Sequence, residues 1–322
     1  MRDALLVAAG LFSVVAGAND GSAVLSAGLL VPGLRPLVSL AMLLVAVVVG
    51  PWLLFGTSVA TTLAHRLVPF SGPSAGRVML AATLSAMVVV FGLVRAGLPT
   101  SLTLALVGAI TGAGLGAGLS VSGGELAEIL LFGLVAPVVS SVLAFSVAPL
   151  VLRAAGGTRA SRRLLRWHRA AFCLQCLAYS ANGGQKMLAV FAVAAGSASG
   201  GLVRDTWWLA VLVAGLFGLG VLSGIRGVSA KLGKEILAVH LRHAVVAETC
   251  SFVVVMGAGL AGVPLTMSQS VAGALVGAGV SEARTRVRWP AVVRMAGAWA
   301  VTLPASIAVA ALAGALTRSV QI

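Results

Sequence analysis

The stretch Gly17-Ala18-Asn19-Asp20 is a polar break in a run that is otherwise apolar or small from Leu5 to Val31. An ionised Asp at the centre of a membrane helix costs about 2.5–3.5 kcal/mol, so such a residue usually lines a functional site. The second half of the chain carries a similar break, Ser180-Ala181-Asn182-Gly183-Gly184-Gln185-Lys186, again inside an apolar run. Polar breaks in both halves of a membrane chain predict the binding site of a transporter.

The composition is that of a membrane protein. The 322 residues are 59% hydrophobic and 9% charged, with a mean hydropathy of +1.08. Soluble domains carry roughly 25% charged residues. The apolar runs are also continuous rather than alternating, which makes a β-barrel the weaker alternative. We therefore predict an all-α polytopic protein of the cell (plasma) membrane, with the lipid bilayer as its surroundings.

The net charge of +14 does not indicate a nucleic-acid partner, because the Arg and Lys residues lie in short loops between apolar segments. Three cysteines, Cys173, Cys176 and Cys250, are too few for a disulfide framework. The single Cys-x-x-Cys pair has no second ligand pair for a metal. We expect no metal centre and no cofactor, apart from Na⁺ as a coupling ion.

Ten apolar segments follow one another along the chain, each near the ~20 residues that a bilayer requires. They are 5–31, 38–57, 78–96, 99–119, 126–151, 171–197, 206–225, 243–262, 264–281 and 291–315. Segments 99–119 and 264–281 each open on a Pro and are dense in small polar residues. These two either span the bilayer or form re-entrant hairpins lined by protein.

Charge distribution predicts the orientation. The loop 153–170 contains six arginines, which favours the cytoplasmic side. Alternation of the ten segments then places most of the other Arg and Lys residues on that same side. The same alternation predicts that both termini face outward.

The two halves of the chain resemble each other. At a constant offset of 165, Arg77–Gly114 aligns with Arg242–Gly279 without a gap. At an offset of 163, Ala18-Asn19 aligns with Ala181-Asn182, so the polar breaks also correspond. This register is informative because Gly and Ala richness alone would not align the polar breaks as well.

Five segments in each half is an odd number, so the second half must insert upside down. We therefore predict two inverted-topology repeats, 1–152 and 171–322, joined by a basic cytoplasmic loop, 153–170. Broken or re-entrant helices are expected at the midplane, with substrate bound between the repeats.

Four polar stretches converge at this midplane if the repeats pack around a pseudo-twofold axis. Their hydroxyls, amides and helix-start N–H groups suit an oxyanion, and a lysine adds a full positive charge. For each Ser or Thr the alternative is a bond to a carbonyl of its own helix, and for the lysine it is a position at the membrane interface. The predicted substrate-binding residues are Asn19, Thr100, Ser101, Thr103, Asn182, Gln185, Lys186, Thr266, Ser268 and Gln269.

Two carboxyl groups within apolar segments, Asp20 and Glu248, are candidates for binding a coupling Na⁺ or proton. The alternative for Glu248 is a structural partner for an Arg or a hydroxyl. His65, His168, His240 and His243 all lie in or beside basic loops, so no coupling histidine is predicted. The sequence shows no nucleophile–base pair, phosphate-binding loop or metal cluster, and we predict that the protein is not an enzyme.

At these residues the sequence resembles the inorganic phosphate transporter family, often called PiT. Its members carry a GANDxAN-type signature early in each half and a PVSTTH-type signature later in each half. The early signature corresponds here to Gly17–Asp20 and, in the second half, to Ser180–Gly183 followed by Gln185-Lys186. The later signatures correspond to Leu98–Thr103 and Val263–Gln269. The resemblance covers nearly the whole chain in the same order.

The resemblance implies uptake of inorganic phosphate with Na⁺ or H⁺ by a two-repeat carrier that forms a homodimer. The chain departs from the signatures at three kinds of position. Gly183 stands where the second early signature has Asp, Leu104 and Gln269 stand where the later ones have His, and Gly21-Ser22-Ala23 lacks the second Asn. Two alternatives follow from these losses: a permease for sulfate or another tetrahedral oxyanion, and a non-transporting sensor or accessory paralogue.

Overall fold

The computed structural model describes residues 2–51, 56–70, 74–98, 100–154, 160–195, 207–224 and 236–319, and every regular element within them is helical. The first half contains α1 (Arg2–Ala16), η1 (Gly17–Gly21), α2 (Ser22–Leu29), α3 (Pro36–Val49), α4 (Ser58–Thr61), η3 (Thr62–Arg66), α5 (Ala75–Arg95), α6 (Leu102–Ala117) and α7 (Gly123–Ala154). The second half contains α8 (Ala160–Tyr179), η4 (Ser180–Gly184), α9 (Gln185–Ala195), α11 (Trp207–Gly224), α13 (Leu241–Leu260), α14 (Met267–Glu282), η5 (Arg284–Arg286) and α15 (Trp289–Ser319).

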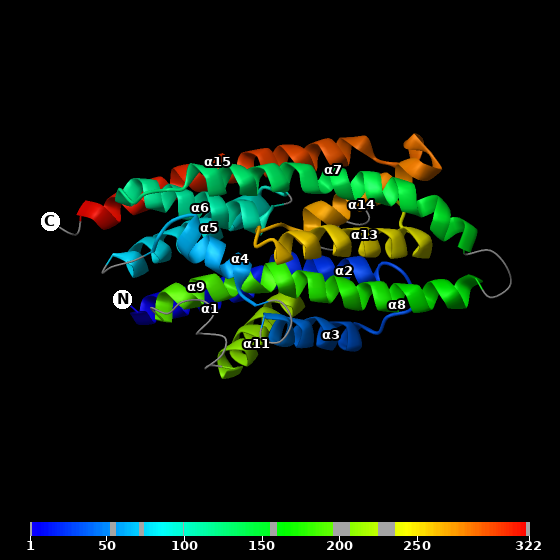
Figure 1. Ribbon diagram of the computed structural model, residues 1–322, viewed down its shortest axis with the longest axis horizontal. Helices are drawn as coiled ribbons and strands as arrows, with labels where there is room; N and C mark the ends of the chain where they lie inside the picture. Colours follow the sequence, from blue (N-terminus) through cyan, green and yellow to red (C-terminus); the bar gives the residue numbers. More distant parts are fainter. Residues whose placement is uncertain are drawn as a thin grey trace.

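The two halves run in opposite directions along the long axis of the molecule (Figure 1). The broken helix α1–η1–α2 runs from the end of the molecule that holds the N-terminus toward the opposite end. The broken helix α8–η4–α9 runs back toward the N-terminal end. α7 and α15, with 32 and 31 residues, are the longest of the described helices and run antiparallel (Figure 1). α1 begins and α15 ends at the same end. The fold is therefore the predicted one: an all-α polytopic membrane protein made of two inverted repeats.

Two helical hairpins turn back near the middle of the molecule from opposite ends (Figure 1). α5 and α6 form the first hairpin, and α13 and α14 form the second. The segments predicted at 99–119 and 264–281 therefore form re-entrant hairpins rather than spanning the bilayer, because each returns toward the end from which its hairpin entered. The residues that lead into α6 and α14 at these tips, Thr100, Ser101, Leu265 and Thr266, are buried in protein, which is the setting in which a membrane tolerates broken backbone.

Each of the ten predicted segments corresponds to a helix, although parts of 38–57, 99–119, 171–197, 206–225 and the loop 153–170 lie outside the described residues. Two differences stand out. α4 and η3 form a short helical stretch that was not predicted, because it is too short to cross a bilayer. α8 begins at Ala160, within the predicted loop, because Arg, Leu and Ala are strong helix formers and its arginines stay exposed.

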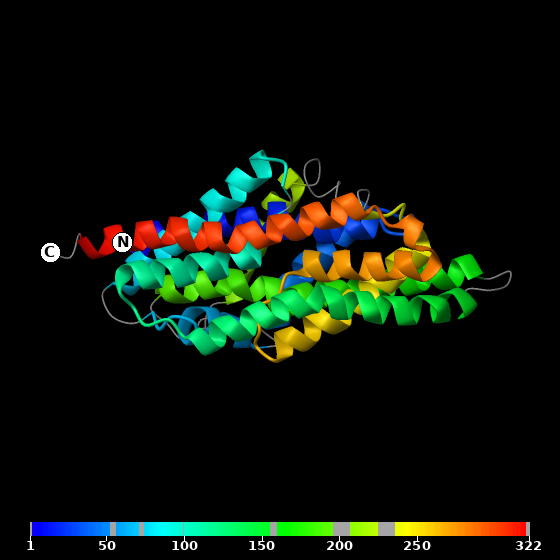
Figure 2. The same ribbon diagram turned by 90° about the horizontal axis from the view of Figure 1, so that it is seen from above.

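Glycine seams hold each hairpin against the long helix of the other repeat. A Cβ atom on Gly112 of α6 would overlap the Ile307 carbonyl group of α15, and one on Gly277 of α14 would overlap the Ser141 carbonyl group of α7. Seen from above, α6 lies along α15 and α14 along α7 (Figure 2). Gly112 and Gly277 are 165 positions apart, so the aligned glycines make the same contact in both repeats. Small residues allow this close approach in lipid, where apolar burial contributes little.

The helices present an apolar surface to the bilayer. Exposed large side chains on α7 and α15 include Leu134, Val142, Val293 and Leu312. Among the described residues, five helices are long and apolar enough to cross a membrane: Arg2–Leu29 counted through its break, Ala75–Arg95, Gly123–Val151, Leu241–Leu260 and Trp289–Ser319. The protein is accordingly a multi-pass membrane protein.

Candidate substrate and coupling site

Both polar breaks adopt π-helical geometry in the middle of a broken helix. Residues Gly17–Gly21 form η1 between α1 and α2, and Ser180–Gly184 form η4 between α8 and α9. A π-helical turn is wider than an α-helical one, leaves the regular bonding pattern and is frequent at functional sites. In both breaks this geometry surrounds an asparagine, Asn19 or Asn182, close to the tip of its own repeat's hairpin.

Each asparagine binds that hairpin tip. Asn19 accepts a hydrogen bond from the Thr100 hydroxyl at 3.0 Å and donates one to Asp20 at 2.9 Å. Asn182 donates to the Val263 carbonyl oxygen and accepts from the Leu265 amide, both at 2.8 Å. Since Thr100 and Leu265 correspond at the offset of 165, the two repeats use equivalent contacts to position their tips.

The two tips also contact each other at the centre of the molecule. The Ser101 hydroxyl lies 2.7 Å from the Thr266 hydroxyl, and Thr103 donates to the Leu265 carbonyl oxygen at 3.2 Å. Lys186 donates from its Nζ atom to the Thr103 hydroxyl and, at 2.8 Å, to the Leu265 carbonyl oxygen. Only 1% of Lys186 is exposed, so its charge is directed at the junction rather than at the membrane interface.

The hydroxyl groups could have bonded either at the predicted site or to carbonyl oxygens of their own helices. Thr103 and Thr266 bond across the two hairpins instead of to a carbonyl of their own helix. Ser101 has a second role as the N-cap of α6, because its hydroxyl accepts from the Leu104 amide at 3.2 Å. Four predicted substrate-binding hydroxyl residues, Thr100, Ser101, Thr103 and Thr266, therefore gather at one place together with Asn19, Asn182 and Lys186.

Asp20 is the carboxyl group that lies beside Asn19 in this site. It is 3% exposed and lies close enough to Lys186 for the two charges to interact, but they form no ion pair within 4 Å. The site thus contains one buried lysine and one buried carboxyl group, and Asn19 donates a hydrogen bond to the latter.

Three predicted substrate-binding residues have other surroundings. The Gln185 side chain accepts from the Val59 and Ala60 amides at 2.8 and 3.2 Å, so it caps the short helix α4. Ser268 is partly buried, and its hydroxyl makes no hydrogen bond. Gln269 lines an apolar cavity of about 600 Å³ between α7, α14 and α15. The structure places none of these three against Lys186.

Tyr179 occupies the space beside the glycine that replaces the signature's second Asp. A Cβ atom on Gly183 would overlap the Tyr179 ring. Tyr179 is 1% exposed, and its hydroxyl has no hydrogen-bond partner. Its ring also packs against Phe217, with 5.4 Å between ring centroids. The Tyr179 ring thus occupies the space into which a side chain at position 183 would point.

Introducing an Asp at position 183 should therefore destabilise the protein as long as the Tyr179 ring is present. We expect Gly183→Asp to lower the melting temperature of the purified protein, because the new side chain overlaps a packed ring and overpacking costs about 1–3 kcal/mol. Tyr179→Ala removes the overlapping ring, so the double variant should lose less stability than the sum of the two single variants. Thermal unfolding of both single variants and the double variant in detergent measures the effect, and an unperturbed Gly183→Asp protein would show that the ring moves freely.

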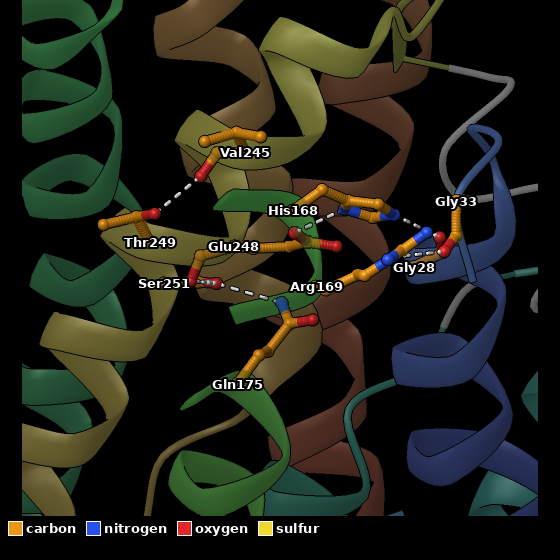
Figure 3. Close-up of polar contacts among 9 residues, drawn as sticks. All are labelled: Gly28, Gly33, His168, Arg169, Gln175, Val245, Glu248, Thr249 and Ser251. Atoms are coloured by element: carbon orange, nitrogen blue, oxygen red, sulfur yellow. Dashed lines mark hydrogen bonds and ion pairs between the residues drawn. The ribbon is translucent and has the colours of Figure 1, made fainter. Parts of the chain in front are cut away.

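Glu248 pairs with His168, a histidine that is not among the predicted site residues. His168 Nδ1 is 2.9 Å from Glu248 Oε2, and His168 Nε2 is 3.1 Å from the Gly28 carbonyl oxygen (Figure 3). The expectation that His168 belongs to a basic loop is wrong, because it is fully buried on α8. The partner of Glu248 is accordingly neither an Arg nor a hydroxyl.

The signal for His168 was present in the sequence as helical periodicity. The buried positions of α8 include His168, Phe172, Gln175, Cys176 and Tyr179, which are spaced by three and four residues. This pattern marks one face of a helix. Arginines on the opposite face made the stretch read as a loop.

Two inverted repeats whose broken helices and hairpin tips enclose a buried lysine, hydroxyl groups and a carboxyl group define a membrane transporter. The model of the phosphate transporter family matches residues 16–172 and again 153–310. The chain therefore belongs to the phosphate transporter family, and its members are transporters rather than enzymes.

Individual relatives agree with this assignment. A Mycobacterium bovis protein named as a probable low-affinity inorganic phosphate transporter is 28% identical over 97% of this chain and 76% of its own length. A Bacillus subtilis protein of the same description is 24% identical over 96% of this chain and 95% of its own length. A solved structure, the sodium-dependent phosphate transporter, shares the fold with a TM-score of 0.79 at 18% identity, over 98% of this chain and 99% of that one.

Proposed function

We propose that this protein is a secondary active transporter that carries inorganic phosphate across the cell membrane together with Na⁺ or H⁺. The observation that carries the proposal is the position of Lys186. Its ammonium group comes from the broken helix of the second repeat and reaches the Thr103 hydroxyl on the hairpin of the first. A buried lysine bonded to a hydroxyl group at the junction of two repeats suits the binding of an oxyanion.

Phosphate would be held by charge and by hydrogen-bond donors from both hairpins. Helices α6 and α14 begin at Leu102 and Met267, so the positive ends of two helix dipoles approach the junction from opposite directions. Ser101, Thr103 and Thr266 supply hydroxyl donors. In the structure Ser101 bonds to Thr266, and Thr103 bonds to Lys186 and to the Leu265 carbonyl oxygen. The anion would replace these contacts with contacts to its own oxygens.

The same contacts provide a means of alternating access. The Ser101–Thr266 pair joins the tips of the two hairpins, which point into the molecule from opposite ends. Moving either hairpin away from the junction would open the site toward the end from which that hairpin enters. Inverted repeats make the two movements structurally equivalent, which is the usual basis of alternating access.

Reconstitution tests this function. Purified protein in liposomes should take up radiolabelled phosphate, with Na⁺ and H⁺ gradients imposed separately to identify the driving ion. Excess unlabelled sulfate should leave uptake unchanged, since the named relatives are phosphate transporters. Sulfate uptake without competition from phosphate would instead assign the chain to a sulfate permease. Uptake of neither anion would leave a sensor or accessory role.

Asp20 is proposed as the carboxyl group that binds the coupling cation. Replacing Asp20 with Asn should abolish gradient-driven accumulation, because the variant loses the buried negative charge while its volume is kept. Phosphate exchange without a gradient should continue, and the melting temperature should stay near that of the wild type. Accumulation at the wild-type level in Asp20→Asn would remove Asp20 from the coupling mechanism.

The orientation and the assembly are part of the same proposal. Arginines on α8 and η5 lie at the end of the molecule opposite the start of α1 (Figure 1). By the positive-inside rule that end is cytoplasmic, and both termini are outside. Thiol labelling of single cysteines placed at each end tests the orientation. Cross-linking of the purified protein in membranes tests the homodimer that the family resemblance implies.

A further inference from the structure

His168 and Glu248 form a buried titratable pair apart from the anion site. His168 is 0% and Glu248 is 2% exposed. Glu248 Oε2 bonds to His168, while Glu248 Oε1 has no hydrogen-bond partner. An incompletely bonded buried carboxyl group is costly, and within a membrane it usually marks a proton or ion pathway. The Glu248 carboxyl group makes no hydrogen bond to a residue of the anion site, so anion binding does not account for it.

The geometry fixes how many protons the pair holds. A backbone carbonyl oxygen only accepts, so the contact with Gly28 requires a proton on His168 Nε2. The 2.9 Å contact between His168 Nδ1 and Glu248 Oε2 then needs one further proton between the two atoms, because otherwise two lone pairs face each other. With that proton the pair is neutral, either as acid and imidazole or as carboxylate and imidazolium. Without it the pair carries a net charge of −1.

Neighbouring charges do not neutralise that change. On α8, His168 and the buried Cys176 thiol are the groups that interact electrostatically with Glu248. α2 and α3 contain no titratable residue, and α7 carries its charged residues, Glu125, Glu128 and Arg153, near its two ends. On α14 the single acid, Glu282, is bound by Arg242 and His243 of α13. Arg169 is exposed and binds the Gly33 carbonyl oxygen instead.

The pair joins three elements that lead into the anion site. Gly28 lies on α2, which follows Asn19 and Asp20, and His168 lies on α8, which leads to Asn182 and Lys186. Glu248 lies on α13, which leads to the second hairpin tip. The aligned position in the first repeat is Thr83, whose hydroxyl bonds to the Met79 carbonyl oxygen of its own helix. The pair therefore exists on one side of the anion site only.

We propose that His168 and Glu248 together form a proton-binding site that couples phosphate movement to the pH gradient. This proposal rests on the proposed phosphate transport. The proton enters from solvent, is held between His168 Nδ1 and Glu248 Oε2, and returns to solvent on the other side of the membrane. Its loss leaves His168 with one N–H for two acceptors, Glu248 Oε2 and the Gly28 carbonyl oxygen, so one of the two contacts is lost. α8 then separates locally from α13 or from α2, and the movement is transmitted to the residues that follow on those helices.

Glu248→Gln is the decisive variant. A glutamine amide can donate to His168 Nδ1 as the protonated carboxyl group does, so the helices stay joined, but the pair no longer releases a proton. The matched control is Gln175→Met, which removes a buried hydrogen bond between the same helices, Gln175 to Ser251 at 3.1 Å, without removing a titratable group (Figure 3). His168→Gln provides an independent removal of the site.

Two assays in proteoliposomes separate the outcomes. One measures phosphate exchange at equal pH on both sides, and the other measures accumulation driven by an alkaline interior. Wild type and Gln175→Met should do both, whereas Glu248→Gln and His168→Gln should keep exchange and lose the pH-driven accumulation. Unchanged pH-driven accumulation in Glu248→Gln, or accumulation in the wild type that responds only to Na⁺, would overturn the proton site alone. Absence of phosphate exchange in the wild type would overturn the proposed function with it.

Discussion

Replacing Lys186 with Met is expected to abolish phosphate uptake into proteoliposomes. Lys186 is the buried cation at the junction of the two hairpins, and its Nζ atom bonds to groups on both of them. Hydrogen bonds to a charged group are worth about 1.5–3 kcal/mol, which corresponds to a loss of roughly 10- to 100-fold in phosphate affinity. Removal of the charge also leaves Asp20 without a compensating cation, so the combined effect on uptake should exceed the loss in binding.

The matched controls separate charge from folding. Thr249→Val removes a hydroxyl that bonds only to the Val245 carbonyl oxygen of its own helix (Figure 3), and it should leave uptake unchanged. Lys186→Arg keeps the charge but changes its shape, so it should retain part of the uptake. Wild-type uptake by a folded Lys186→Met protein would place the anion elsewhere.

Gly277→Ala is expected to lower the stability of the protein strongly, as few other additions of a single methyl group would among the described residues. The new Cβ atom would overlap the Ser141 carbonyl group, which is backbone and cannot rotate away. α14 would have to move off α7, and overpacking of this kind costs about 1–3 kcal/mol, or more where backbone must shift. The same displacement should shift the second hairpin tip and reduce phosphate uptake. Thermal unfolding and uptake measure the two consequences.

Gly257→Ala is the control for this substitution. Gly257 lies on α13, and a Cβ atom there would meet nothing within 4 Å. Alanine is the better helix former, so the variant should be as stable as the wild type or more stable by up to about 1 kcal/mol. Equal melting temperatures for Gly277→Ala and Gly257→Ala would mean that the seam between α14 and α7 is looser than the structure shows.

Much of the fold could be predicted from the sequence because the membrane imposes it. Apolar length gave the ten segments, and the odd number in each half gave the inversion. The gapless alignment also anticipated the matching seams of Gly112 and Gly277, since a close helix crossing requires a small residue at a fixed place in each repeat. The polar breaks at Asn19 and Asn182 stood out because little else at that depth is polar.

The finer arrangement of the site could not be predicted, since it depends on which polar groups meet across elements. Gln185 lies next to Lys186 in sequence, yet it caps α4, a helix too short to give a hydropathy signal. His168 was read as part of a loop because arginines surround it in sequence, although they occupy the other face of the helix. Tyr179 is not among the predicted site residues. The glycine at position 183 shows that a carboxyl group is missing, but not which side chain lies beside it.

Binding of a tetrahedral oxyanion between the two hairpin tips is tested most directly by determining the structure with arsenate, whose arsenic atom can be located by anomalous scattering. We predict one arsenic peak per chain, within hydrogen-bond distance of Lys186 Nζ and beside the Ser101 and Thr266 hydroxyls. Lys186→Met should lack that peak. A peak at another place in the wild type, or one that persists in Lys186→Met, would contradict the assignment of the anion site.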